Sequence, residues 1–245
     1  MIDLVYSEFL KLKKSYIFYC ILFGAIAIPI AVYISSFNMG GKNVVQSDIY
    51  GSLINMGIMQ IQILYTILFS LISSYVFSRE FSDKTANILY SYRSGRIKIF
   101  FAKFITIYIL VLITYLINFA SIIIMMYGIF GFEGAKIIFF IQLKSSIWSA
   151  LMQIFIIPVP MFLGSVSKNI IIPIIYSLIG AVSSMMIMIS GIYMQFSFFM
   201  LPALPLYYFY NGDPIDYIAV FFVAGITFII SIFLNIYYWG KIDIA

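Results

Sequence analysis

Residues 99–127 read IFFAKFITIYILVLITYLINFASIIIMMY, an apolar run in which Lys103 is the single charge. A helix needs about 20 such residues to cross a bilayer, and similar runs recur along the 245-residue chain. Hydrophobic residues make up 64% of the sequence and charged residues 9%, whereas a soluble domain carries about a quarter charged residues. The sequence therefore predicts an all-α polytopic membrane protein, with residues 1–245 forming one transmembrane domain.

The apolar runs predict six spans and an orientation. Basic residues gather on the cytoplasmic side of a membrane protein. With the N-terminus inside, 11 of the 14 lysines and arginines face the cytoplasm and three face outward. We therefore expect both termini to be cytoplasmic. The expected spans are 16–36, 52–77, 99–127, 146–166, 170–190 and 217–239.

The segment 192–210 is also apolar and long enough to cross the membrane. Pro202 and Pro205 would break a helix there, and its tyrosines suit the membrane interface. We expect residues 191–216 to form a re-entrant hairpin in the outer leaflet. The alternative is a seventh span, which would place the C-terminus outside.

Residues 1–14 predict an amphipathic helix that lies in the membrane plane at the cytoplasmic face. Polar side chains recur there at helical spacing, opposite a mainly apolar face. A simple positive anchor that fixes orientation is the alternative, and one helix can serve both purposes. The candidate residues of this interfacial helix are Glu8, Phe9, Lys11, Lys13 and Lys14.

The loop 78–98 gathers charge in a chain that has little of it. Seven charged residues fall between positions 79 and 98. Ser82 or Asp83 can cap a short helix in this loop, and Gly95 can close it. An amphipathic helix of this kind could dock into a groove on a cytoplasmic partner. The alternative is that it lies on the lipid headgroups, held by its basic residues.

The residue types exclude several chemistries. The chain has no histidine and one cysteine, Cys20, so it lacks a catalytic triad and a zinc-binding cluster. No phosphate-binding loop is present, because Gly40-Gly41-Lys42 is followed by Asn43. The acidic residues all lie near span ends or in loops, whereas proton- or sodium-driven carriers keep ionisable groups at mid-membrane. We expect no catalytic residue, no metal and no cofactor in this chain, and we read the net charge of +5 as cytoplasmic loop charge, with no nucleic-acid partner.

Neutral amides stand within the expected spans. A buried amide needs hydrogen-bond partners, and it can either line a pathway or join helices together. Asn55 and Gln62 are seven residues apart, so we expect them to share a helix face. The candidate pathway residues are Asn55, Gln62, Asn118 and Gln153.

Three motifs together resemble a known family. The segment E-F-x-K-x-K at Glu8–Lys13 leads into the first span, R-E-F-S-D-K-T at Arg79–Thr85 ends the second, and S-G-R-I-K-I-F-x-x-K at Ser94–Lys103 enters the third. This order is similar to that of the six-span permeases of type-2 ABC exporters, especially those of bacterial lantibiotic, bacitracin and antimicrobial-peptide export and immunity systems.

The resemblance implies roles for these segments. Residues 1–14 would be the elbow helix, and residues 191–216 the outer re-entrant segment. The loop 78–98 would hold the coupling helix gripped by a separate ATPase, which would bind the ATP and magnesium. Two permease chains, identical or related, and two ATPases would work together in the bacterial cytoplasmic membrane and export amphipathic peptides. The implied coupling residues are Arg79, Glu80, Phe81, Asp83, Lys84, Thr85 and Leu89.

Two other functions fit the same residues. The same family could move drugs, lipids or ions. A stand-alone immunity protein could instead bind a toxic peptide in the membrane without transporting it.

Overall fold

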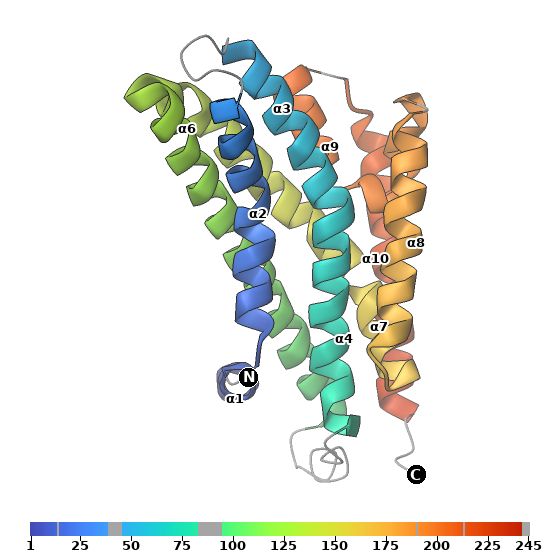
Figure 1. The fold of residues 1–245 in the computed structure, drawn as a ribbon. Helices are drawn as coiled ribbons and strands as arrows, with labels where there is room; N and C mark the ends of the chain where they lie inside the picture. Colours follow the sequence, from blue (N-terminus) through green and yellow to red (C-terminus); the bar gives the residue numbers. More distant parts are fainter. Residues whose placement is uncertain (14, 39–45, 83–94, 190, 213, 242–245) are drawn as a thin grey trace.

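The computed structural model describes residues 1–13, 15–38, 46–82, 95–189, 191–212 and 214–241. Every regular element in these ranges is a helix (Figure 1). The elements are α1 Ile2–Leu12, α2 Ile17–Asn38, α3 Gln46–Met59, η1 Gln60–Tyr65, α4 Thr66–Ser82, α6 Arg96–Ile156, α7 Pro158–Ser167, α8 Ile171–Met188, η2 Gly191–Phe196, η3 Phe198–Met200, α9 Leu204–Leu206, η4 Tyr207–Asn211 and α10 Tyr217–Lys241.

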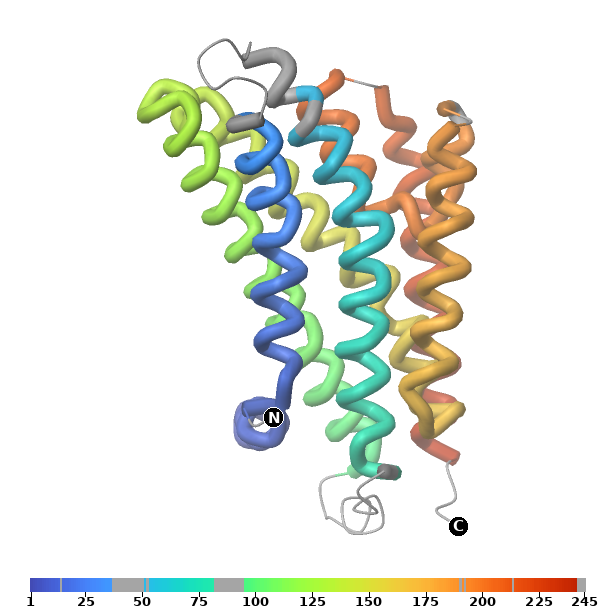
Figure 2. The backbone as a smooth tube through the Cα atoms, viewed as in Figure 1, coloured from blue at the N-terminus to red at the C-terminus, as the bar shows by residue number. Residues whose placement is uncertain are grey.

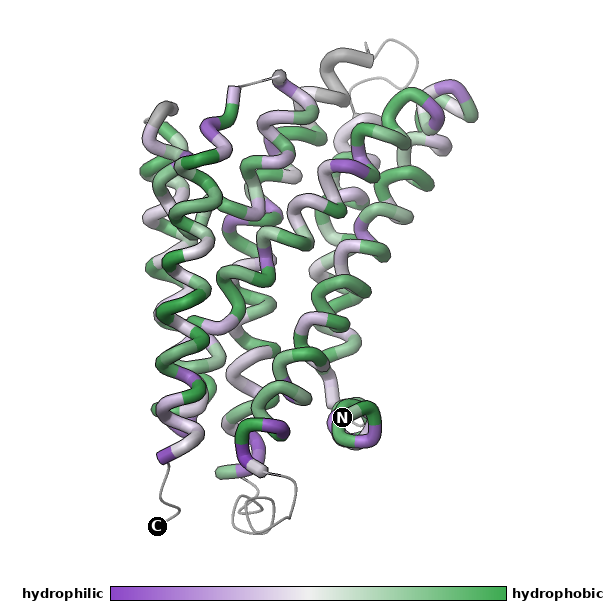
Figure 3. The backbone as a smooth tube through the Cα atoms, turned by 180° about the vertical axis from the view of Figure 1, so that it is seen from behind, coloured by the Kyte–Doolittle hydropathy of each residue, from purple (hydrophilic) through white to green (hydrophobic). Residues whose placement is uncertain are grey.

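Within the described residues, five helical segments are long and apolar enough to cross a membrane. Hydrophobic residues dominate along most of their length (Figure 3). The expectation of a helical polytopic membrane protein is therefore confirmed, with five candidate segments where six spans were expected. They are Ile17–Ser36, Leu53–Phe81, Arg96–Ser167, Ile171–Met188 and Tyr217–Lys241.

The third segment explains the difference between five and six. It is 72 residues long, and its α6 portion alone would measure about 90 Å if straight, far more than the roughly 30 Å hydrocarbon core. Gly131 breaks its helical geometry with φ 69° and ψ −159°, a conformation that favours glycine. The first arm of α6 rises to the upper end of the bundle and the second arm runs back down (Figure 1). The expected span 99–127 lies on the first arm, and the expected span 146–166 begins on the second arm and continues through α7.

The second segment, Leu53–Phe81, is interrupted by the π-helix η1 between α3 and α4. Two buried amides fasten this region to its neighbours. Gln60 Nε2 donates to the Gly24 carbonyl of α2 at 2.7 Å, and Asn118 Nδ2 of α6 donates to the Ala25 carbonyl at 2.9 Å and to Gln60 Oε1 at 3.2 Å. Interhelical hydrogen bonds of this kind hold membrane helices together.

Small residues bring α4, α7 and α8 close together. A Cβ placed on Gly164 of α7 would lie 3.0 Å from Cα of Ser74 in α4, so the two backbones approach as only a glycine permits. Ser70 Oγ donates to the Pro173 carbonyl of α8 at 2.7 Å. These contacts make α4 the centre of this side of the bundle.

The segment 191–216 consists of short helical pieces and turns back on itself. The end of α8 and the start of α10 lie at the same end of the bundle (Figure 2). Gln195 joins the two ends, since its Nε2 donates to the Pro214 carbonyl at 3.1 Å and its Oε1 accepts from the Asp216 amide at 2.7 Å. Residues 200–207 between these ends are buried. The chain therefore turns back within this segment, and its place in the outer leaflet stays a prediction.

Helix α1 lies across the axes of the other helices, at the end of the bundle where α10 ends (Figure 1). Glu8 and Leu12 are buried, whereas Ile2 and Tyr6 are exposed. The face turned toward the protein therefore carries both Glu8 and an apolar contact, while other apolar side chains of α1 point away from the bundle. A helix placed in this way can rest its outer face in a membrane surface.

Candidate functional site

The expected coupling loop is described only at its two roots. Residues 83–94, with Asp83, Lys84, Thr85 and Leu89, lie outside the described residues, as does Lys14. Arg79, Glu80 and Phe81 form the last turn of α4 before this loop, and α6 begins just after it. The structure places α1 beside both roots, so the residues at this end form one site.

Four charged side chains from three helices meet at this end, and we call them the ion cluster: Glu8, Lys11, Glu80 and Lys103. Lys103 Nζ lies 2.9 Å from Glu80 Oε1 and 3.6 Å from Glu8 Oε2. Lys11 Nζ lies 2.6 Å from Glu8 Oε1 and 3.2 Å from Glu80 Oε1. Two carboxylates therefore face two ammonium groups, and the formal charges of the cluster cancel.

The cluster is buried at its centre and open at one side. The Lys103 side chain is 0% exposed, whereas that of Lys11 is 37% exposed. A buried lysine must find partners for its ammonium, and Lys103 also donates to the Val76 carbonyl at 2.8 Å. Its Nζ lies 5.4 Å from the centre of the Phe77 ring, which adds a cation–π contact.

Aromatic rings form the floor beneath Lys103 and bring in a fourth helix. The fully buried Trp239 of α10 packs edge-on against Phe77, with ring centres 5.5 Å apart, and lies 6.1 Å from Phe100. Helices α1, α4, α6 and α10 therefore meet within one packed unit.

Arg79 attaches the end of α1 to α4. Its Nη1 donates to the Lys11 carbonyl at 2.6 Å, in the last turn of α1, where carbonyls lack helical partners. The guanidinium also lies 5.8 Å from the centre of the Tyr75 ring. Arg79 thus caps α1 from a neighbouring helix, a role that the sequence pattern alone did not indicate.

The electrostatics keep Lys11 charged. Burial disfavours the ammonium and lowers its pKa, but hydrogen bonding and attraction to Glu8, with further contributions from Glu80, outweigh burial, so the pKa of Lys11 rises above its usual value. Lys11 therefore keeps its charge at neutral pH.

The remaining candidates of this end are less enclosed. Phe9 packs against the hydrophobic core, and Lys13 is exposed. Phe81 receives Lys168 Nζ at 5.2 Å from its ring centre. Lys168 stands at the turn after α7 with a left-handed φ of 52°, so that turn also touches the end of α4.

The structure does not place the four pathway candidates in one channel. Asn55 is exposed, whereas Gln62 is buried and its Nε2 donates to Met200 Sδ at 2.9 Å. Asn55 lies on α3 and Gln62 within η1, where the wider turn alters the regular spacing of a helix face. Asn118 joins helices, and Gln153 is buried with no described partner for its Oε1. A transport role for these four residues stays a prediction.

Sequence reasoning missed Lys103 as a partner of the two glutamates and Trp239 as the floor of the site. A lysine within a long apolar run is a signal of a buried ion pair, because an unpaired charge there is costly. The described residues contain no group of histidine, cysteine or acidic side chains suited to a metal ion.

The fold and the site define a multi-pass helical membrane protein whose buried charge cluster lies at the roots of a loop. The family model of the ABC-2 family transporter proteins matches residues 4–184. The chain belongs to this family, whose members are membrane permease subunits and work with an ATPase partner. No curated protein and no solved structure matches the chain significantly.

Proposed function

We propose that this chain is the permease subunit of an ATP-driven exporter, with a separate cytoplasmic ATPase that grips the loop 78–98. The carrying observation is the ion cluster, which links both roots of that loop to α1. In this proposal α6 crosses twice, giving six spans, and both termini lie in the cytoplasm of a bacterium.

The ion cluster suggests how force could pass from the loop to the spans. Any displacement of the loop acts on Glu80 at one root and, through α6, on Lys103 near the other. Because these residues are 2.9 Å apart and buried, separating them would leave unpaired charges in a low-dielectric environment, at a high cost in free energy. The two roots would therefore move as one body and carry α1 with them, as packed helices do in rigid-body transitions.

The assembly and the cargo rest on the family resemblance. Two permease chains, as a homodimer or with a related subunit, would combine with two ATPases that bind ATP and magnesium. The cargo would be an amphipathic or antimicrobial peptide, expelled as part of export or immunity. Drug, lipid or ion cargo within the same family is the alternative, which a cargo screen in vesicles would separate.

The test is a purification of the intact chain from its native membrane, followed by an ATPase assay in vesicles. A co-purifying ATPase should be stimulated by the wild-type permease. Glu80→Lys should abolish stimulation, because three ammonium groups would then face one carboxylate. The charge swap Glu80→Lys with Lys103→Glu should recover part of it, since the pair at 2.9 Å is restored with reversed sign, although Lys11 and Glu8 would then each face a like charge.

Lys136→Glu is the matched control, because Lys136 is an exposed lysine on the second arm of α6, far along the chain from the loop. It should leave stimulation unchanged. Normal stimulation in a well-folded Glu80→Lys variant would contradict the coupling role. A chain that purifies alone and still protects cells from a peptide would favour an immunity protein without transport.

A further inference from the structure

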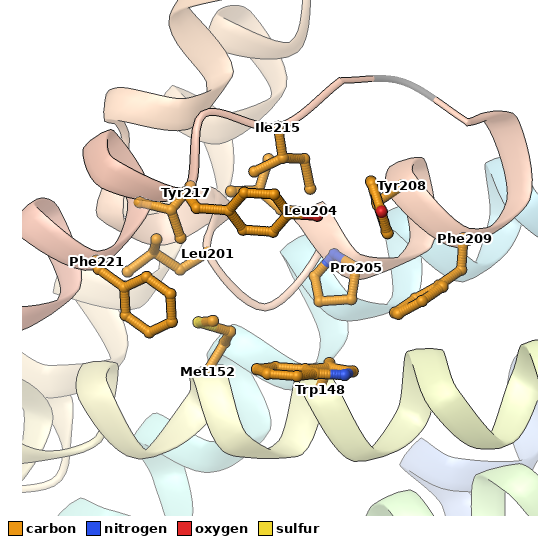
Figure 4. A pocket seen from close by; sticks show the side chains of 11 residues that line it. Trp148, Met152, Leu201, Leu204, Pro205, Tyr208, Phe209, Ile215, Tyr217 and Phe221 are labelled. Carbon is orange, nitrogen blue, oxygen red and sulfur yellow. The ribbon is translucent and has the colours of Figure 1, made fainter.

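An apolar pocket opens beside the segment 191–216, at the end of the bundle opposite the ion cluster. Its volume is about 270 Å³. One wall is the second arm of α6, another is the start of α10, and the third is the buried stretch that contains Leu204 and Pro205 (Figure 4). The pocket therefore lies where this stretch packs against two of the candidate membrane segments.

Among the described residues, those that line the pocket are aromatic or aliphatic, and none of them is charged. Trp148 and Met152 of α6 form the floor, and Phe221 of α10 closes one side (Figure 4). The polar atoms belong mainly to Tyr208 and Tyr217, whose rings pack edge to face with centres 6.1 Å apart. Such a surface offers an occupant dispersion contacts and very few hydrogen bonds.

The pocket is bordered by apolar side chains that are exposed at the protein surface. Trp148, Tyr217 and Phe221 at the pocket are 44%, 54% and 53% exposed, and Phe222 beside them is 68% exposed. They continue into the exposed apolar face of α10. In a chain that spans a bilayer, the medium at this face is lipid hydrocarbon.

The size of the pocket argues that something occupies it. A cavity of about 150 Å³ lined by apolar side chains excludes water and holds a benzene-sized molecule. At 270 Å³ the pocket exceeds that volume, and it lies just below the roughly 300 Å³ of the smallest drug-binding sites. It suits one flexible hydrocarbon segment better than a folded ligand.

We propose that this pocket is a binding site for one hydrocarbon tail of a membrane phospholipid. The tail enters from the bilayer at the face of α10 and packs between Trp148, Met152 and Leu204. A peptide would have to bring its backbone amides into a site with almost no partners for them, at a high cost in free energy. The inference uses the membrane-spanning fold and is independent of the proposed transport function.

The first test uses tryptophan quenching by phospholipids with brominated tails in vesicles. The chain has two tryptophans: Trp148 lines the pocket, and the 0% exposed Trp239 is an unquenched internal reference. The difference between wild type and Trp148→Phe isolates the signal of Trp148. Val220→Phe adds a ring at a 3% exposed pocket position and should reduce quenching of Trp148 by half or more.

The matched control is Phe233→Trp in the Trp148→Phe background, because Phe233 is 66% exposed on α10 and does not line the pocket. Val220→Phe should leave its quenching unchanged. The proposal is overturned if Trp148 is not quenched, as expected when a second copy or another protein fills the pocket. It is also overturned if Val220→Phe folds and leaves the quenching of Trp148 unchanged.

A second measurement keeps the test decisive if Val220→Phe does not fold. A phospholipid with a photoreactive tail is cross-linked to the wild-type chain, and adducts are mapped by mass spectrometry. Met152 is 7% exposed and out of reach of bulk lipid, whereas Met186 on α8 is 69% exposed. Labelling at Met152 comparable to that at Met186 supports the pocket site, and labelling confined to Met186 overturns it.

Discussion

Lys103→Met is expected to be among the most destabilising single changes at the ion cluster. The ammonium is 0% exposed and lies 2.9 Å from Glu80 and 3.6 Å from Glu8. At an effective dielectric of about 20 these attractions amount to about 6 and about 5 kcal/mol, and desolvation of the ammonium takes back several kcal/mol. Breaking a buried pair in this way typically costs about 3–5 kcal/mol.

The contrast with Lys11 makes the magnitude testable. Lys11→Met removes an ammonium at similar distances, but that side chain is 37% exposed, so solvent screening limits the cost to about 0–1 kcal/mol. For a chain of this length, about 2–4 °C of melting temperature correspond to 1 kcal/mol. We expect Lys103→Met to lower the melting temperature in detergent by about 6–20 °C and Lys11→Met by a few degrees at most.

The double variant Glu80→Gln with Lys103→Met separates charge pairing from loss of packing. It removes one charge of each sign and leaves the Glu8–Lys11 pair balanced. We expect it to be within about 2 kcal/mol of wild type, because replacing both partners of a buried pair is far less costly than removing one. A Lys103→Met variant no less stable than Lys11→Met, or a double variant no better than Lys103→Met, would refute the buried-pair reasoning.

Three further predictions follow from single contacts. Gly180→Leu should expose the segment 191–216 to protease, because a Cβ at Gly180 would lie 2.1 Å from the Phe199 ring. Gly57→Ala should not, because its Cβ would lie 3.6 Å from the Leu206 side chain. Equal cleavage of the two variants would argue against this packing. Gln60→Leu should cost about 1–2 kcal/mol in a thermal melt, since it removes buried hydrogen bonds between helices, and an unchanged melt would mean that these bonds contribute little. The raised pKa of Lys11 implies a contribution to stability that is present below the usual lysine value of 10.5 and is lost as the pH rises above it. Thermal melts across pH 9–11.5 should therefore show a loss of stability at alkaline pH that is smaller in Lys11→Met than in wild type. Identical pH profiles of the two proteins would contradict this.

The apolar runs predicted the helical membrane class and most of the spans, because crossing a bilayer imposes a length and a composition on each helix. The hairpin course of 191–216 was also predictable, since Pro202 and Pro205 disfavour a continuous helix. The sequence did not indicate that the residues between the expected spans 99–127 and 146–166 would also be helical. The chain stays helical on both sides of Gly131, because a single residue with positive φ is enough to reverse its direction.

The site was predictable in its members and not in its geometry. The motifs singled out Glu8, Lys11, Arg79 and Glu80, but the register that brings Lys103 between the two glutamates depends on the packing of three helices. No local pattern encodes that register. The different exposure of Asn55 and Gln62 also depends on more than a local pattern, since the wider turn of η1 alters the regular spacing of a helix face.

The burial of Lys103 also determines how the ion pair between α4 and α6 responds to salt. Dissolved ions screen exposed charges over about 8 Å at physiological ionic strength, and buried pairs much less. Lys103 is 0% exposed and both glutamates are nearly buried. The strength of the ion pair between α4 and α6 should therefore change very little with salt concentration. Only the contribution of the open side, at Lys11, should weaken in a concentrated electrolyte. The ion pair between α4 and α6 should therefore persist when osmotic stress changes the salt concentration.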